Sequence, residues 1–215
     1  MQQGIVHAYC VVMSKEGVST INITVIVRTL TPLADAFDWF GIPYHLSGSI
    51  AAVVYGKPRT MQGIDVVADI KFSQVQTLVT RLEQTYDVKE AVMRDAIEQR
   101  GSFGLVHHDT LQKIDVLLPS YRAYNQVKQG RVQQHALEQG SRPFHVASLE
   151  DMILTVLERY KAGGKHSPLL WEDIKEVLAA QGSSLDLAYL QLWATPLDVV
   201  LLLEQAIVEA GLGKP

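Results

Sequence analysis

The sequence predicts a mixed α/β fold followed by a helical module, on three observations. Apolar residues alternate with polar ones over residues 64–70 and 111–118, which is the period of strands that bury one face. Between these strands, residues 73–85 and 91–99 carry apolar residues at helical spacing. From Ser148 onward the spacing is helical throughout. Interleaved strands and helices indicate an α/β (α+β) arrangement, a mixed sheet flanked by helices, with a C-terminal helical module after it.

The order of these elements divides the chain into three expected segments. Residues 1–30 form an N-terminal extension of unknown role, residues 31–147 the α/β domain, and residues 148–215 the helical module. Within the first segment, residues 21–27 alternate as a strand does. That segment is either an extra edge strand or a loosely held extension.

Shorter elements complete the expected fold. Thr31 and Pro32 have the order of an N-cap and a first helical residue, which predicts a helix that begins there. A short strand over residues 44–46 and an apolar helix over residues 50–55 follow. Four helices are expected in the helical module, opened by Ser148, Ser167, Asp186 and Thr195.

The composition limits the class of protein. The 215 residues are 47% hydrophobic and 20% charged, which suits one domain, or a domain with a small appendage, and excludes wholesale disorder. Lys and Arg number 19 against 23 Asp and Glu, a formal net charge of −4, which disfavours a nucleic-acid binder that relies on bulk positive charge. The single cysteine, Cys10, excludes an internal disulfide framework and a cysteine-built zinc site, and it fits a reducing compartment.

No membrane segment is expected. Polar residues interrupt every apolar run before it reaches the ~20 residues that a spanning helix needs. No Lys or Arg precedes the apolar run over residues 5–13, so that run lacks the basic region of a secretory signal. We therefore expect a cytoplasmic protein.

The stretch from Gly48 to Asp65 carries the most informative pattern. Gly48 and Ser49 open an expected helix, where free backbone N–H groups, a hydroxyl and the helix dipole together make an anion site. Asp65 lies on the outward face of the next strand, and Asp115 lies beside Lys113 on a later strand. If these two strands are neighbours, both carboxylates can share a divalent cation that also contacts a bound phosphate.

Taken in order, these residues resemble the nucleotidyltransferase fold of the DNA polymerase beta superfamily. The resemblance is greatest to minimal bacterial members, which include toxins of the abortive-infection type. Such proteins have a Gly-Ser loop and helix, then a glycine and an arginine, then an Asp-x-Asp strand and a third acidic strand residue. The matching residues are Gly48, Ser49, Gly56, Arg59, Asp65 and Asp115. The likeness runs from about Pro32 to Gly211, most of the chain.

The resemblance implies transfer of a nucleoside monophosphate from an NTP to a hydroxyl acceptor with Mg²⁺. Asp65 and Asp115 would be the catalytic, metal-binding residues. Gly48 and Ser49 would bind the nucleotide, with assistance from Arg59. The acceptor stays open among RNA such as a tRNA end, a protein side chain and a small molecule, as do the preferred base and the oligomeric state.

Gly63 departs from the family pattern. The first acid of the Asp-x-Asp pair would fall at Gly63, which has no side chain. Asp69 lies four residues beyond Asp65 on the same strand face, about 13 Å away at ~3.3 Å per residue, too far to replace that acid. Because two-metal transfer needs bridging carboxylates, activity is expected to be impaired. The alternative hypothesis is a catalytically inactive relative that binds nucleotide or a partner protein, such as a toxin–antitoxin component.

Each of these features also has a purely structural interpretation. A Gly-Ser pair is commonly a turn with an N-cap. Asp115 and Lys113 are also consistent with a surface ion pair on a solvated strand face. Neighbouring strand residues point to opposite faces, so His107 and His108 are not expected to bind one metal ion.

Overall fold

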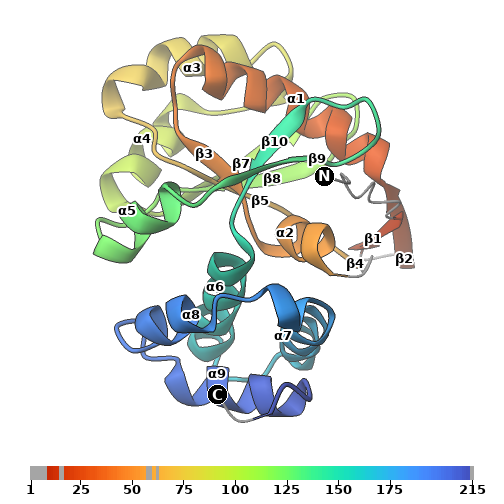
Figure 1. The fold of residues 1–215 in the computed structure, drawn as a ribbon. Helices are drawn as coiled ribbons and strands as arrows, with labels where there is room; N and C mark the ends of the chain where they lie inside the picture. The colour runs from red at the N-terminus through yellow and green to blue at the C-terminus, as the bar shows by residue number, and fades with distance from the viewer. Residues whose placement is uncertain (1–8, 15–16, 57–59, 62, 214–215) are drawn as a thin grey trace.

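The computed structural model describes residues 9–14, 17–56, 60–61 and 63–213, and Figure 1 shows their arrangement. Within these residues, a seven-stranded mixed sheet has the order β6-β7-β8-β5-β3-β10-β9, and a three-stranded sheet has the order β2-β1-β4. The strands of the larger sheet are β3 (Tyr44–Leu46), β5 (Ile64–Ala68), β6 (Tyr86–Asp87), β7 (Ser102–His107), β8 (Lys113–Leu117), β9 (Gln133–Ala136) and β10 (Pro143–Val146). Those of the smaller sheet are β1 (Tyr9–Ser14), β2 (Gly17–Asn22) and β4 (Thr60–Met61).

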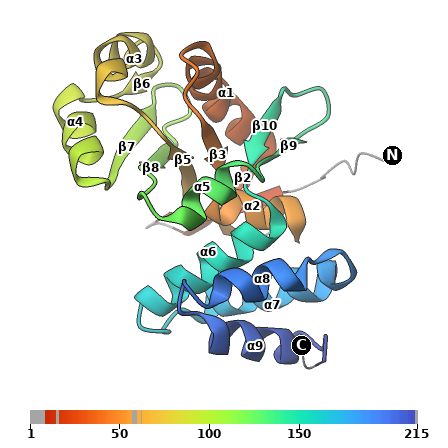
Figure 2. The same ribbon diagram turned by 60° about the vertical axis from the view of Figure 1, so that its left-hand side comes forward.

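Most of the helices lie in two groups, one at each end of the molecule. The α-helices of the described residues are α1 (Ile23–Trp39), α2 (Gly48–Tyr55), α3 (Val75–Leu82), α4 (Glu90–Gln99), α5 (Ala123–Gln129), α6 (Leu149–Ala162), α7 (Pro168–Gln181), α8 (Leu187–Ala194) and α9 (Val200–Glu209). Figures 1 and 2 place α1, α3 and α4 at one end of the molecule and α6 to α9 at the other. The predicted fold class, a mixed sheet flanked by helices with helices alone after it, is confirmed. The division into three segments stays a prediction.

Alternation along β5 sets which residues face the core. Ile64, Val66 and Ala68 are each 1% exposed, whereas the residues between them are partly exposed. Leu33 and Phe37 of α1 line a small void together with Val66, so α1 covers the apolar face of β5. The opposite face of the strand is therefore free to carry polar side chains.

The start of the first helix is a correction to the sequence prediction. We expected a strand over residues 21–27 and a helix from Thr31, but β2 ends at Asn22 and α1 begins at Ile23. Ile26 and Leu30 are buried at helical spacing, and this burial outweighs the short alternating pattern. Pro32 consequently lies inside α1 rather than at its start.

Tyr86 repairs the hydrogen-bond ladder of α1 beside this proline. Its hydroxyl donates to the carbonyl of Thr29 at 2.6 Å and accepts the backbone N–H of Leu33 at 3.0 Å. Leu33 and Thr29 are the i and i−4 residues that would otherwise bond each other, so the phenol is inserted into the ladder. This contact allows a proline in the middle of a buried helix.

The C-terminal helices begin largely as expected. Ser148 caps α6, where its hydroxyl accepts the N–H of Asp151 at 3.2 Å. The fourth helix was expected to open at Thr195, but α9 begins at Val200. Asp198 has a φ of 55°, in the left-handed region, so the chain turns before the helix starts.

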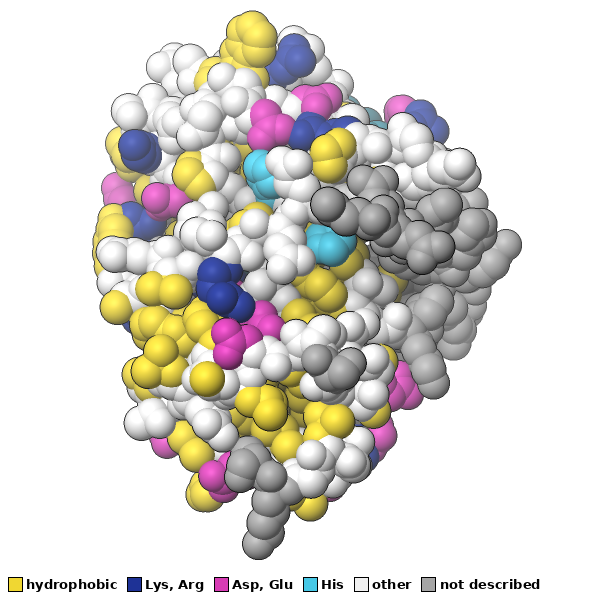
Figure 3. Space-filling view, in the orientation of Figure 1, with side chains coloured by type: hydrophobic (Ala, Val, Ile, Leu, Met, Phe, Trp, Pro, Cys, Tyr) yellow, Lys and Arg dark blue, Asp and Glu magenta, His cyan; other side chains and the backbone are white. Residues whose placement is uncertain are grey.

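The surface of the C-terminal helices is partly apolar. Leu192 and Leu201 are 66% and 80% exposed, and hydrophobic side chains are visible over this half of the molecule in Figure 3. None of the described helices combines the length and apolar character needed to cross a membrane.

Replacing Tyr86 with Phe tests the repaired helix. We expect the free energy of unfolding to fall by about 1–3 kcal/mol, because the N–H of Leu33 and the carbonyl of Thr29 lose a buried partner. Urea denaturation measures this change. Tyr160→Phe is the control, because Tyr160 is partly exposed and contacts Trp171 through its ring. Equal stability of the two variants would contradict the role given to Tyr86.

Candidate active site

The two predicted carboxylates lie side by side on neighbouring strands. β5 and β8 are parallel, and Asp65 is the register partner of Asp115. Partners in a parallel pair point to the same face, on strands about 4.8 Å apart. Their side chains are 18% and 39% exposed. The condition set by the sequence analysis, that these strands are neighbours, is therefore met, and the carboxylates form a pair on the outward face of the sheet.

The start of α2 lies directly against this pair. The N–H of Ser47 donates to the carbonyl of Asp65 at 3.0 Å, which fastens the helix start to β5. Gly48 has a φ of 55°, and a Cβ built there would lie 2.3 Å from Oδ2 of Asp65. Only glycine satisfies both conditions. Ser49 follows in the first turn of the helix, so the expected anion site and the carboxylate pair are in contact.

Each carboxylate of the pair already has a cationic partner. Nη1 of Arg159 lies 3.0 Å from Oδ2 of Asp65, and Nζ of Lys113 lies 2.7 Å from Oδ1 of Asp115. The Lys113 pair is one that the sequence suggested, whereas Arg159 comes from α6 and was not foreseen. Both cations are more than half exposed, so these ion pairs are weak and can be displaced by a ligand.

Among the residues that the structure describes, no third acid completes the site. A Cβ at Gly63 would meet no atom within 4 Å, so the position of the missing acid is open space. Asp69 is held elsewhere, because Nη1 of Arg100 lies 3.2 Å from its Oδ1. Among the described residues there is no group of three or more His, Cys, Asp or Glu side chains that could hold a metal ion. The pair can therefore supply one or two ligands to a metal, not a closed protein cage.

The adjacent histidines, His107 and His108, have different surroundings. His107 is buried, and its Nδ1 accepts the N–H groups of Asp109 and Thr110 at 3.2 Å each, so it holds a turn. Burial lowers the pKa of His107, with the Asp109 carboxylate opposing this shift. His108 is exposed, and the expectation that the two histidines do not bind one metal ion stays a prediction. Arg59 lies outside the described residues.

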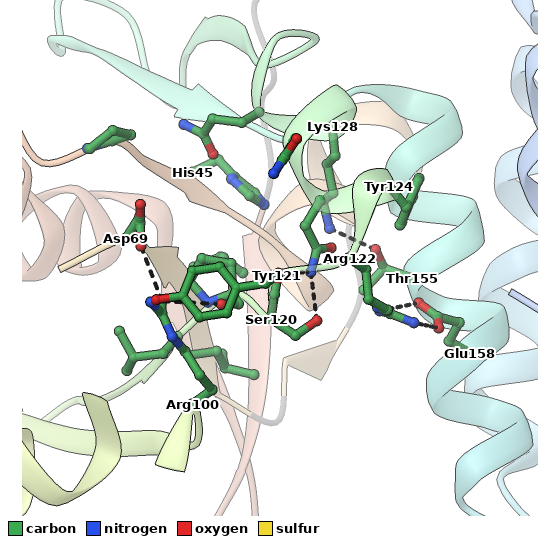
Figure 4. A pocket seen from close by; sticks show the side chains of 18 residues that line it. His45, Asp69, Arg100, Ser120, Tyr121, Arg122, Tyr124, Lys128, Thr155 and Glu158 are labelled. Atoms are coloured by element: carbon green, nitrogen blue, oxygen red, sulfur yellow. Dashed lines mark hydrogen bonds and ion pairs between the residues drawn. The ribbon is translucent and has the colours of Figure 1, made fainter. Parts of the chain in front are cut away.

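A cavity of about 560 Å³ opens over the sheet, and Figure 4 shows side chains that line it. Val67 and Leu117, the next outward residues after Asp65 and Asp115, lie in its floor. Its walls include Tyr124 and other residues of α5, Thr155 and Glu158 of α6, and His45 of β3. This cavity was not predicted, because it exists only when α5 lies over the sheet and α5 itself was not predicted.

The described fold was compared with known proteins. No family model and no curated protein matches the sequence. Among solved structures, an antigenic nucleotidyltransferase-like protein from Paracoccidioides brasiliensis is 16% identical, with a TM-score of 0.53, and the match covers 89% of this chain and 94% of that one. ANT(2")-Ia in complex with adenylyl-2"-tobramycin is 14% identical, with a TM-score of 0.53 and coverage of 80% and 97%. The solution structure of the antibiotic-resistance factor ANT(2'')-Ia is 16% identical, with a TM-score of 0.50 and coverage of 88% and 96%. The chain therefore has a nucleotidyltransferase-like fold.

Proposed function

We propose that this chain binds a nucleoside triphosphate and transfers its nucleoside monophosphate to a hydroxyl acceptor. The observation that carries the proposal is the contact between the start of α2 and the carboxylate pair of Asp65 and Asp115. An anion bound at the helix start would repel these carboxylates unless a cation lies between them. Mg²⁺ commonly binds through one or two carboxylates together with substrate phosphates, which is the donor set that this arrangement offers.

The residues have separate roles in the proposed reaction. The first-turn N–H groups of α2 and the Ser49 hydroxyl bind phosphate oxygens, and Gly48 lets the chain pass close to Asp65. Asp65 and Asp115 hold Mg²⁺, which when bound would neutralise the phosphate oxygens. Arg59 is proposed to assist at the phosphates.

The transfer step itself is a displacement at phosphorus. The acceptor oxygen forms a bond with the α-phosphorus as the bond to the β-phosphate oxygen breaks, and pyrophosphate leaves. The acceptor proton passes to a carboxylate of the pair or to water. The cavity beside the pair favours a small molecule as acceptor over RNA or a protein side chain, since about 560 Å³ lies within the usual range of small-molecule sites.

A second candidate function is nucleotide binding without transfer, in a catalytically inactive relative. Two observations favour it: position 63 has no carboxylate, and Arg159 and Lys113 already neutralise the remaining pair. A partner protein, such as the other component of a toxin–antitoxin pair, would then be the functional target. The two candidates share the nucleotide site and differ in whether product forms.

Titration with ATP, GTP, CTP and UTP, with Mg²⁺ or with EDTA, tests the shared site. We expect calorimetry to detect binding that requires Mg²⁺ and that weakens at least tenfold, or about 1.4 kcal/mol, in Asp65→Asn and in Asp115→Asn. Each substitution keeps the shape of the side chain and removes its charge. Asp95→Asn, an exposed carboxylate on α4, is the control and should bind as the unaltered protein does. Binding that survives EDTA and both variants would refute the metal site.

Paired glycine variants test the contact between α2 and Asp65. Gly48→Ala places a Cβ 2.3 Å from Oδ2 of Asp65 at a left-handed φ, so we expect Mg²⁺-dependent nucleotide binding to be lost. The Gly63→Ala variant is the control because its Cβ meets no atom within 4 Å. If Gly48→Ala binds nucleotide as tightly as Gly63→Ala, the helix start is not part of the site.

Restoring the missing acid separates transfer from binding alone. We expect Gly63→Asp to tighten Mg²⁺-dependent ATP binding about tenfold, because a third carboxylate enters open space beside the pair. Release of pyrophosphate from labelled NTP, measured in the same variant, should rise at least tenfold. Gly63→Asn is the matched control without the charge. If the unaltered protein transfers nucleotide as fast as Gly63→Asp, the importance given to this position is wrong.

A further inference from the structure

Three buried polar side chains line one part of the cavity wall. His45, Tyr124 and Lys128 are 2%, 3% and 6% exposed, and all three line the cavity. Among the described residues, neither ring nitrogen of His45 has a hydrogen-bond partner, and the Tyr124 hydroxyl lies near the Asp151 carboxylate without completing a hydrogen bond. Gln129 lies beside the His45 ring but falls short of hydrogen-bond geometry. Buried polar groups without partners are rare in folded proteins, so this cluster is a candidate binding site for a polar ligand.

Lys128 is a buried cation of the cavity wall that makes no ion pair with a described residue. Its Nζ donates to the hydroxyl of Thr155 at 2.8 Å, and no carboxylate of the described residues lies within ion-pair distance. The two arginines of the wall are compensated. Arg122 lies 2.7 Å from Glu158, and Arg100 lies 3.2 Å from Asp69. The Asp151 and Glu158 carboxylates attract this ammonium group from beyond ion-pair distance, and an anionic ligand in direct contact would stabilise it further.

The protonation states of these side chains suit an anion. Burial lowers the pKa of Lys128 to about 8, so the ammonium form still prevails at pH 7. Burial and the nearby Lys128 ammonium lower the pKa of His45 to about 3, so its ring is neutral and has one N–H to donate. In the view of Figure 4, His45 lies between Asp69 and Lys128. This part of the cavity therefore offers two donors, the Lys128 ammonium group and the His45 N–H.

We propose that the cavity binds a small molecule through an anionic group, a carboxylate or a phosphate, held by Lys128 and His45. The rest of the molecule lies over Val67 and Leu117 in the floor, a surface suited to an apolar or aromatic body. Tyr121 in the wall is 78% exposed. Its ring stacks on Arg100, with 3.9 Å between the guanidinium carbon and the ring centroid. This binding requires neither Mg²⁺ nor the carboxylate pair, so it does not rest on nucleotidyl transfer.

Inorganic phosphate and benzoate are the probes for the test, used on the full chain. We expect calorimetry to detect binding of at least one of them, and the His45 ring signals in NMR spectra to shift as it binds. The more tightly bound probe identifies the anionic group as phosphate or carboxylate. Failure of both probes, at tens of millimolar, to shift the His45 signals would overturn the proposal without any variant.

Lys128→Met is the decisive variant, because it keeps the length of the side chain and removes the charge. We expect it to weaken the bound probe at least tenfold, whereas Lys89→Met, at an exposed lysine before α4, leaves binding unchanged. Thermal unfolding checks that the variant is folded. Phosphate that binds at the nucleotide site instead still binds in Lys128→Met, does not shift the His45 signals and is lost in Gly48→Ala. This pattern would overturn the proposal for the cavity.

Discussion

The close approach of the Gly48 backbone to the Asp65 carboxylate is the constraint on which the site depends. No side chain fits between the start of α2 and Oδ2 of Asp65, and the Ser47 N–H holds the two segments together at the carbonyl of Asp65. This contact fixes the direction of the Asp65 side chain. Because Asp115 is the register partner of Asp65, the second carboxylate is placed by the sheet itself. The helix dipole and the two acids thus meet at one point.

Helix α6 connects this pair to the cavity. Glu158 and Arg159 lie three and four residues after Thr155, so these side chains share one face of α6. That face contacts both the carboxylate pair and the cavity wall. Arg159 binds Asp65, while Thr155 and Glu158 bind Lys128 and Arg122 of the cavity wall. The base of the helix is anchored by Asp151, which is fully buried and accepts the hydroxyls of Ser148 at 2.7 Å and Tyr189 at 2.8 Å. A ligand that displaces Arg159 therefore acts on the same rigid helix that lines the cavity.

The parts of the structure that follow from local pattern were predictable. Alternation identified the strands of Asp65 and Asp115, and their parallel pairing then placed both carboxylates together. The start of α1 was not predictable in this way, because Pro32 is tolerated only through Tyr86, more than fifty residues away. α5, β9 and β10 are short and lack a clear period, so they were missed, and the cavity was missed with them. Arg159 is 94 residues from Asp65, and no local signal marks such a contact.

The central claim is that the Asp65 and Asp115 pair holds a divalent cation together with nucleotide phosphates. A crystal structure with Mn²⁺ and a non-hydrolysable ATP analogue tests it most directly, because manganese is located by its anomalous scattering. The account predicts a manganese peak bound by both carboxylates, phosphate oxygens at the start of α2, and Arg159 and Lys113 withdrawn from the pair. Nucleotide bound elsewhere, or at the helix start with both ion pairs intact and no manganese between the carboxylates, would contradict it.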